Sequence, residues 1–139
     1  MYEVDDLFEG MECRTRVWVS QKAAAAILEH DRRRGKRRKA DPRGEFLQAL
    51  ERYAANGFAH YEGAQGRPIR HEGDGVYRIG MKRSLFRIIG FYEDESRADF
   101  IAIDTFTKKG QSLSGSQRKR IREAARVKRD RLWKRRWKR

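Results

Sequence analysis

Residues 76–109 read VYRIGMKRSLFRIIGFYEDESRADFIAIDTFTKK, and this stretch decides the fold of the chain. Apolar and polar residues alternate along Val76–Lys82, which is the pattern of a β-strand with one covered face. Leu85–Tyr92 is apolar on both faces apart from Arg87, as in a central, largely covered strand. Glu93–Ser96 supplies turn residues, and Phe100–Thr107 forms a third apolar run. The stretch therefore predicts a meander of three strands that carries cations inside or at the ends of its runs.

The residues before this meander predict one further strand and two helices. Cys13–Ser20 alternates like a strand, and Ser20 is a suitable cap for a helix that begins at the next residue. Gly35 ends or interrupts that helix, and residues 36–42 read as a loop. A second helix fits Gly44–Asn56, because its apolar residues recur at helical spacing.

The other segments complete a single domain over residues 1–139. The acidic residues 1–12 predict an arm or a short helical turn, and Phe58–Asp74 reads as a long loop. After a linker at Gly110–Gly115, Ser114 or Ser116 caps a basic C-terminal helix and tail over residues 116–139. The order strand–helix–helix–strand–strand–strand–helix predicts an α+β fold, in which helices pack on a small, mostly antiparallel sheet.

Composition narrows the class of protein. With 139 residues, of which 38% are hydrophobic, the chain is long enough for one modest core. One cysteine, Cys13, excludes an internal disulfide framework and is typical of the reducing cytoplasm, so we expect a cytoplasmic protein. The three histidines lie far apart without ligand spacing, and we expect neither a metal site nor a cofactor. No stretch has the length of a membrane span or the pattern of a secretory leader, and we expect no membrane partner.

The net charge of +14 is unevenly distributed along the chain. Residues 32–39 hold seven cations and no acid, and residues 118–139 carry +11, so the rest of the chain has a net charge of −4. Such segregation favours a polyanionic partner, above all nucleic acid, over a merely solubilising surface. The candidate nucleic-acid-binding residues are Arg32, Arg33, Arg34, Lys36, Arg37, Arg38, Lys39, Arg118, Lys119 and Arg122, with Trp133 and Trp137 either stacking on bases or docking on the domain.

The cations of the meander suit a more specific role. Arg78 and Lys82 share one strand face, Arg87 lies across a tight turn, and Lys108 and Lys109 end the third strand. If the strands pair consecutively, these side chains converge on one face of the sheet, where they would bind phosphates and stabilise the extra negative charge of an RNA cleavage transition state. The alternative is that they are solvated residues at the edge of a small sheet.

Three segments resemble the RelE superfamily of bacterial toxins, closest to its phage-derived HigB-like branch. They are GVYRIGMKRSLFRIIGFYEDES (75–96), DFIAIDTFTKKGQSLS (99–114) and RKRIREAARVKRD (118–130). In that branch, a strand with "vYR", a strand with a central arginine and a strand ending in "F.KK" precede a basic helix. The resemblance covers about residues 75–130. The N-terminal strand and the two helices agree in order only.

This resemblance implies a metal-independent endoribonuclease that cuts mRNA on the ribosome and is neutralised by a small antitoxin protein. Carried over by position, Arg78 falls where the family has a basic residue on the first meander strand, and Arg87 matches the arginine of the next strand, which contacts the scissile phosphate. Lys108 and Lys109 fall on the basic pair after the last strand. The chain departs from the pattern at Gly80, where some members have a lysine, and at Asp104, near a position that is often histidine.

The general acid and base of such an enzyme have no clear counterpart in this sequence. Several members of the family use a C-terminal tyrosine or histidine as a stacking group or acid, and this residue has no clear counterpart here. His71, Tyr77 and Lys82 are the candidates for proton transfer, although a lone loop histidine is more often idle. The acids of Glu93–Glu95 do not fill the gap with a metal, because consecutive acids in a hairpin turn alternate sides and do not converge on Mg²⁺.

Two other functions remain open on the sequence. The first keeps the fold without the nuclease, as a gyrase-inhibiting ParE-like toxin or a phage-encoded protein that binds nucleic acid or a host factor. The second is a basic structural protein of the ribosome or chromatin, in which residues 118–139 do all the binding.

Overall fold

A computed structural model of the chain describes residues 1–38, 44–63, 68–110 and 112–136, and of residues 35–38 only the backbone course. The elements are β1 (Tyr2–Asp6), β2 (Arg16–Ser20), α1 (Gln21–Arg38), α2 (Glu45–Asn56), the 3₁₀ helix η1 (Phe58–Tyr61), β3 (Ile69–His71), β4 (Val76–Ile79), β5 (Phe86–Tyr92), β6 (Asp99–Thr107), α3 (Gly115–Arg129) and β7 (Trp133–Arg135). The α+β class is therefore confirmed.

One mixed sheet holds the seven strands of the described residues, in the order β3-β4-β5-β6-β2-β1-β7. The meander pairs consecutively and antiparallel, β4 with β5 and β5 with β6, as its sequence predicts. The strand β2 joins β6 in parallel, with Val17 opposite Phe100. This pairing places the N-terminal strands beside the meander. Parallel strands need a long connection, and the chain between β2 and β6, which includes α1 and α2, supplies one.

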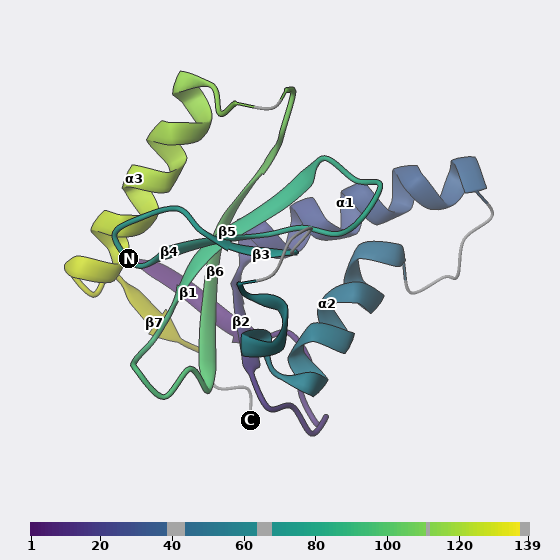
Figure 1. The fold of residues 1–139 in the computed structure, drawn as a ribbon. Helices are drawn as coiled ribbons and strands as arrows, with labels where there is room; N and C mark the ends of the chain where they lie inside the picture. Colours follow the sequence, from purple (N-terminus) through teal and green to yellow (C-terminus); the bar gives the residue numbers. More distant parts are fainter. Residues whose placement is uncertain (39–43, 64–67, 111, 137–139) are drawn as a thin grey trace.

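Helices cover both faces of the sheet. In Figure 1, α1 and α2 lie on one side of the strands and α3 lies on the other. The side chains of β6 alternate accordingly: Phe100 packs in the core beneath α2, whereas Ile101 packs in the core beneath α3. The same double coverage explains why the middle strand, β5, is buried along its length except at Arg87.

Local signals fix where the helices begin. The Ser20 hydroxyl accepts a hydrogen bond from the Ala23 N–H at 3.1 Å, and Ser114 forms a capping box with Gln117 at the start of α3. The helix α2 has no such cap of its own. The carboxylate of Asp31, which belongs to α1, accepts from the N–H groups of Phe46 and Leu47 at 2.9 and 3.0 Å and satisfies the first turn instead.

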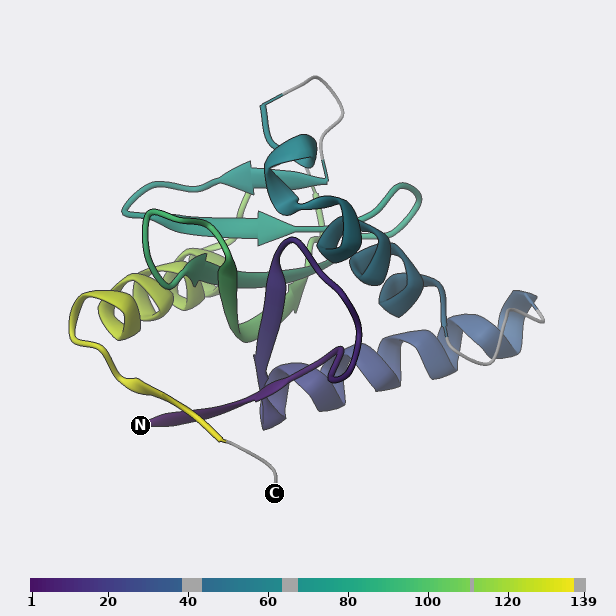
Figure 2. The same ribbon diagram turned by 90° about the horizontal axis from the view of Figure 1, so that it is seen from below.

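The sheet is larger than the sequence predicts, and four predictions are wrong. The helix α1 continues through Gly35 to Arg38, where the sequence predicts a break and a loop. The acidic arm contains β1, the loop Phe58–Asp74 contains η1 and β3, and the basic helix ends at Arg129, after which the chain forms β7. Figure 2 shows the C-terminal strand lying beside the N-terminal one, and Tyr2 pairs in parallel with Trp133. Each added strand is five residues or shorter and is held by partners that lie elsewhere in the sequence.

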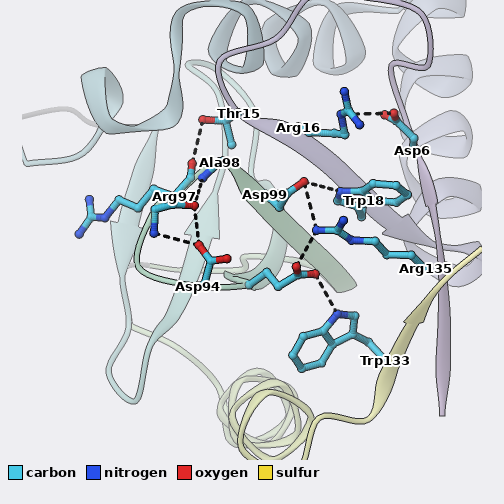
Figure 3. Close-up of polar contacts among 12 residues, drawn as sticks. Asp6, Thr15, Arg16, Trp18, Asp94, Arg97, Ala98, Asp99, Trp133 and Arg135 are labelled. Atoms are coloured by element: carbon cyan, nitrogen blue, oxygen red, sulfur yellow. Dashed lines mark hydrogen bonds and ion pairs between the residues drawn. The ribbon is translucent and has the colours of Figure 1, made fainter.

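Ion pairs hold β7 in place. Figure 3 shows Arg135 reaching across to Asp99, which also accepts from the indole nitrogen of Trp18. The Arg135 guanidinium lies 2.7 Å from a carboxylate oxygen of Glu93 and 4.6 Å from the centre of the Trp18 ring. The next residue, Arg136, lies 2.8 Å from a carboxylate oxygen of Asp5 in β1, so the acidic N-terminal segment and the basic C-terminal segment neutralise each other in part. None of the helices in the described ranges is long and apolar enough to cross a membrane.

Candidate functional site

A hollow of about 910 Å³ opens at the end of the meander, beside α2. It is lined by residues of α2 and η1, by the β3–β4 hairpin, by the turn at residues 81–85, by Arg87 of β5 and by the residue that follows β6. The lining contains one acid, Glu45, whose carboxylate is 2.6 Å from the guanidinium of Arg34. It contains seven cations: Arg52, Arg70, Arg78, Lys82, Arg83, Arg87 and Lys108.

The register of the strands sets three arginines side by side. Arg70 of β3 is directly opposite Arg78 of β4. Gly80 follows β4, and a Cβ atom there would lie 2.7 Å from the side chain of Arg87 on β5. The neighbouring residues Ile69 and Ile79 point to the opposite face, into the core beneath α2. Three adjacent strands therefore present a row of cations on one face, and Gly80 leaves the room that Arg87 occupies.

Arg87 is fixed at one end and free at the other. Its Nη1 donates hydrogen bonds to the carbonyl oxygens of Ser84 at 2.6 Å and Phe86 at 2.8 Å. Burial lowers the pKa of its guanidinium, and the nearby charges of Arg78 and Arg70 lower it further. The remaining N–H groups of the fork have no hydrogen-bond acceptor among the described residues, so they are available to an anionic ligand.

Arg78 is 7% exposed and is incompletely satisfied. Its Nε lies 3.0 Å from a carboxylate oxygen of Glu72, but the N–H is poorly aligned and makes no hydrogen bond there. The Nε2 atom of Gln48, also in the lining, is buried without a hydrogen-bond partner. The described part of the chain has three buried side-chain atoms without a hydrogen-bond partner, and two of them belong to residues of this hollow. Most buried polar atoms in proteins have such a partner.

Lys108 enters the hollow directly after β6. Its backbone N–H donates to the carbonyl oxygen of Leu85 at 2.8 Å, which fixes the residue against the turn at residues 81–85. Burial lowers the pKa of its ammonium group, as do the charges of Arg78 and Arg87. A lysine in this environment releases its proton more readily than an ordinary lysine, and this property suits proton transfer.

Tyr53 joins α2 to the strands at the hollow. Its hydroxyl donates to the carbonyl oxygen of Gly80 at 3.2 Å, and its pKa is raised chiefly by burial. The phenol therefore stays protonated and serves as a hydrogen-bond donor rather than a base.

Of the residues predicted for catalysis, Arg78, Lys82, Arg87 and Lys108 line the hollow. The structure does not bring the other two there. Lys109 is exposed and lies outside the lining. His71 is exposed on β3, where its Nε2 accepts from the Gly75 N–H at 3.2 Å, and its ring lies 4.9 Å from that of Tyr77. Tyr77, the other candidate for proton transfer, packs 5.1 Å from the ring of Tyr92 and also lies outside the lining.

The first predicted basic segment is partly neutralised by its own helix. Arg32 and Arg33 lie 2.7 and 2.8 Å from the carboxylate of Glu29. Arg34 pairs with Glu45, as described above. The side chains of Lys36, Arg37 and Arg38, and the whole of Lys39, lie outside the described residues.

The second predicted basic segment lies on α3. Arg118, Lys119 and Arg122 are exposed there and form no ion pair within the described ranges. Trp133 is half-buried: its ring meets that of Phe91 edge to face at 5.0 Å. Only part of the Trp133 ring is therefore open to a base, and Trp137 lies outside the described residues.

Sequence reasoning missed Arg52, Arg70 and Arg83 as members of the hollow. The position of Arg52 could have been inferred from its spacing. It follows Gln48 by four residues and Glu45 by seven, so the three residues share one face of α2. Arg70 had none, because β3 is only three residues long and lies in a stretch that reads as a loop.

The described residues form no cluster of three or more His, Cys, Asp or Glu side chains that could hold a metal ion. Comparison with protein-family models, with curated proteins and with solved structures finds no match for the chain.

Proposed function

We propose that the chain is a toxin of the RelE/HigB type, a cytoplasmic endoribonuclease that binds RNA phosphates in the cationic hollow and cleaves mRNA on the ribosome. The observation that carries this proposal is the imbalance of charge in the lining, seven cations against one paired acid. Most other arginines of the described residues have a carboxylate partner, whereas Arg70, Arg87 and Lys108 have none there. An anionic ligand would supply the missing partners.

The residues suggest how the reaction would run. Arg78 and Arg87 hold the scissile phosphate, and their fixed charges stabilise the extra negative charge as a 2′-hydroxyl attacks the phosphorus. Lys108, with its lowered pKa, gives its proton to the departing 5′-oxygen. The exposed Lys82 and Arg83 at the rim bind neighbouring phosphates. No step in this scheme requires a metal ion or a cofactor.

A second protein would regulate such an activity. We propose a small antitoxin with an acidic segment, because the same unpaired cations that bind RNA would bind carboxylates. In this scheme, the antitoxin competes with RNA for the hollow.

Cleavage of mRNA on translating ribosomes, mapped by primer extension, tests the proposal. The double variant Arg87→Gln with Lys108→Gln should lose at least about 100-fold in cleavage rate, because it removes a phosphate ligand and the proton donor. The matched control is Arg16→Gln with Arg129→Gln, which removes two exposed arginines outside the lining. Equal cleavage by the two double variants, once thermal unfolding shows both to be folded, would reject the site.

The position of His71 favours one alternative, a protein that binds nucleic acid or a host factor without cutting. Of the three candidates for proton transfer, neither His71 nor Tyr77 lines the hollow, and only the exposed Lys82 does. In that case RNA on translating ribosomes stays intact while the chain still binds it, or supercoiling by gyrase changes instead.

A further inference from the structure

A serine, a histidine and an aspartate form a hydrogen-bonded chain that ends at the hollow. The Ser84 hydroxyl lies 3.0 Å from Nε2 of His30, and Nδ1 of the same ring lies 3.2 Å from a carboxylate oxygen of Asp31. Ser84 belongs to the lining of the hollow, whereas His30 and Asp31 belong to α1. Ser84 and His30 are 54 residues apart in the sequence, so the fold alone brings them together.

The partners of this chain determine where its hydrogens lie. A carboxylate only accepts hydrogen bonds, so Nδ1 of His30 carries the hydrogen that points to Asp31. In the neutral ring, Nε2 is then an acceptor, and the hydroxyl of Ser84 donates to it. The rings of Phe86, stacked at 4.6 Å, and Phe46, edge-on at 5.7 Å, hold the imidazole in this orientation.

The Ser84 oxygen has one further site for a hydrogen bond. A hydroxyl oxygen can accept two hydrogen bonds, and one of these comes from the Phe86 N–H at 3.2 Å. The second acceptor site has no donor among the described residues. Ser84, which is 8% exposed, also offers its carbonyl oxygen to Arg87 at 2.6 Å, so its backbone contacts the guanidinium that would hold the scissile phosphate.

We infer that Ser84 and His30, with Asp31 behind them, form the proton-accepting relay of the hollow, in which a hydroxyl of the bound RNA donates to Ser84. This inference rests on the proposed function and names the base that the sequence did not reveal. Asp31 is a positioning residue in this relay, since among the described residues its carboxylate hydrogen-bonds to His30 and to the first turn of α2.

The reaction moves one proton from the RNA to His30 and exchanges one bond at phosphorus for another. The 2′-hydroxyl of the RNA gives its proton to Ser84 while Ser84 gives its own proton to Nε2 of His30. The 2′-oxygen forms a bond to phosphorus, the bond to the 5′-oxygen breaks, and Lys108 protonates that oxygen. The products are a 2′,3′-cyclic phosphate and a 5′-hydroxyl end. His30 is left as an imidazolium beside Asp31 and Lys108 is left neutral, and exchange with water restores both.

Steady-state cleavage of an RNA oligonucleotide by Ser84→Ala tests the relay, with Ser84→Thr as the conservative variant. Ser84→Ala should lower kcat by about 100-fold or more with little change in KM, because it interrupts proton transfer without touching the cations. Ser84→Thr keeps a hydroxyl and should retain most of the activity. The matched control is Ser112→Ala, which alters an exposed serine outside the lining. His30→Gln should resemble Ser84→Ala, and thermal unfolding of each variant reports whether it is folded.

Binding of the same oligonucleotide with a 2′-deoxy scissile nucleotide separates the relay from the site as a whole. Unchanged affinity of Ser84→Ala for this uncleavable probe, together with the loss of kcat, supports the relay. Wild-type kcat in Ser84→Ala overturns the relay and leaves the proposed function intact. If Ser84→Ala loses affinity for the probe as well as kcat, the relay is also overturned, since Ser84 would then only shape the hollow. If the wild type cleaves neither free nor ribosome-bound RNA, the proposed function fails and the relay fails with it.

Discussion

Replacing Arg70 by glutamine should stabilise the folded protein and weaken its binding to RNA. Arg70 is exposed on the edge strand β3, directly opposite Arg78, and pairs with no carboxylate of the described residues. Like charges directly opposite each other on adjacent strands destabilise a sheet by about 0.2–1 kcal/mol. Since Glu72 already offsets part of the charge of Arg78, we expect a gain near the lower end of this range. For a domain of this size, such a gain raises Tm by about 1–3 °C.

The same substitution should change how RNA binding depends on salt. If Arg70, Arg78, Arg87 and Lys108 each contact one phosphate, the logarithm of the association constant falls with the logarithm of salt concentration with a slope of about −3 for a single strand. Loss of one contact makes this slope shallower by about 0.7. Fluorescence titrations of a labelled single-stranded RNA over a series of salt concentrations measure both slopes.

Two control variants make the outcome specific. Arg70→Lys keeps the charge and should keep the salt slope, although it loses the flat fork of the guanidinium. Arg16→Gln removes an exposed arginine whose partner is Asp6, and should leave RNA binding unchanged. Our account of the hollow is refuted if Arg70→Gln lowers the free energy of unfolding, or if its salt slope equals that of the wild type.

Three further predictions concern the hollow and the strand β7. Gly80→Ala places a methyl group where the Arg87 side chain lies, and should weaken RNA binding while changing the free energy of unfolding in urea by less than about 1 kcal/mol. The cleavage rate should fall as the pH rises through the lowered pKa of Lys108, because only the ammonium form donates a proton. Arg70→Gln should shift this alkaline limb of the pH–rate profile to higher pH, since Arg70 contributes to the lowering. Arg135→Ala removes two ion pairs and a cation–π contact far from the hollow, and should lower the unfolding free energy by about 1–3 kcal/mol with RNA affinity unchanged.

The meander was predictable because each of its strands carries its own signal. The runs Phe86–Tyr92 and Asp99–Thr107 are long enough for their apolar residues to outweigh local preferences. The strand β7 carries no such signal. Its residues Trp133–Arg135 continue a basic helical pattern, and the helix ends instead where Arg131 adopts a φ of 52° and the Leu132 N–H bonds back to Val127. What makes β7 a strand is the free edge of β1, whose paired residues lie 131 positions away in the sequence and cannot be found from local patterns.

Of the proposed site, only the clustering of its cations was predictable from the sequence. Arg78, Arg87 and Lys108 are adjacent in a sheet once the meander pairs in order, and the sequence contains that order. The proton-accepting half depends on the approach of α1 to the turn at residues 81–85, which brings His30 to Ser84. The periodicity of apolar residues predicts each helix or strand separately, but it does not predict that α1 approaches this turn. The sequence therefore directed attention to His71, the histidine nearest the meander, and missed the one that the fold selects.

The ion pairs of the cations say more about the role of each cation than the total number of cations does. Arg135 and Arg136 use the acids of the N-terminal strand and of the β5–β6 turn to hold β7, and Arg120 uses Asp104 to hold α3. These arginines add to the net charge but are occupied in stabilising the fold. Burial lowers the pKa of Arg87 and of Lys108, and repulsion among the cations of the hollow lowers both further. An anion bound in the hollow would relieve this repulsion. A protein selected only for stability would lose such an arrangement, because one glutamine at Arg70 already relieves part of it. Its presence is the physical reason for our proposal that the hollow binds a polyanion.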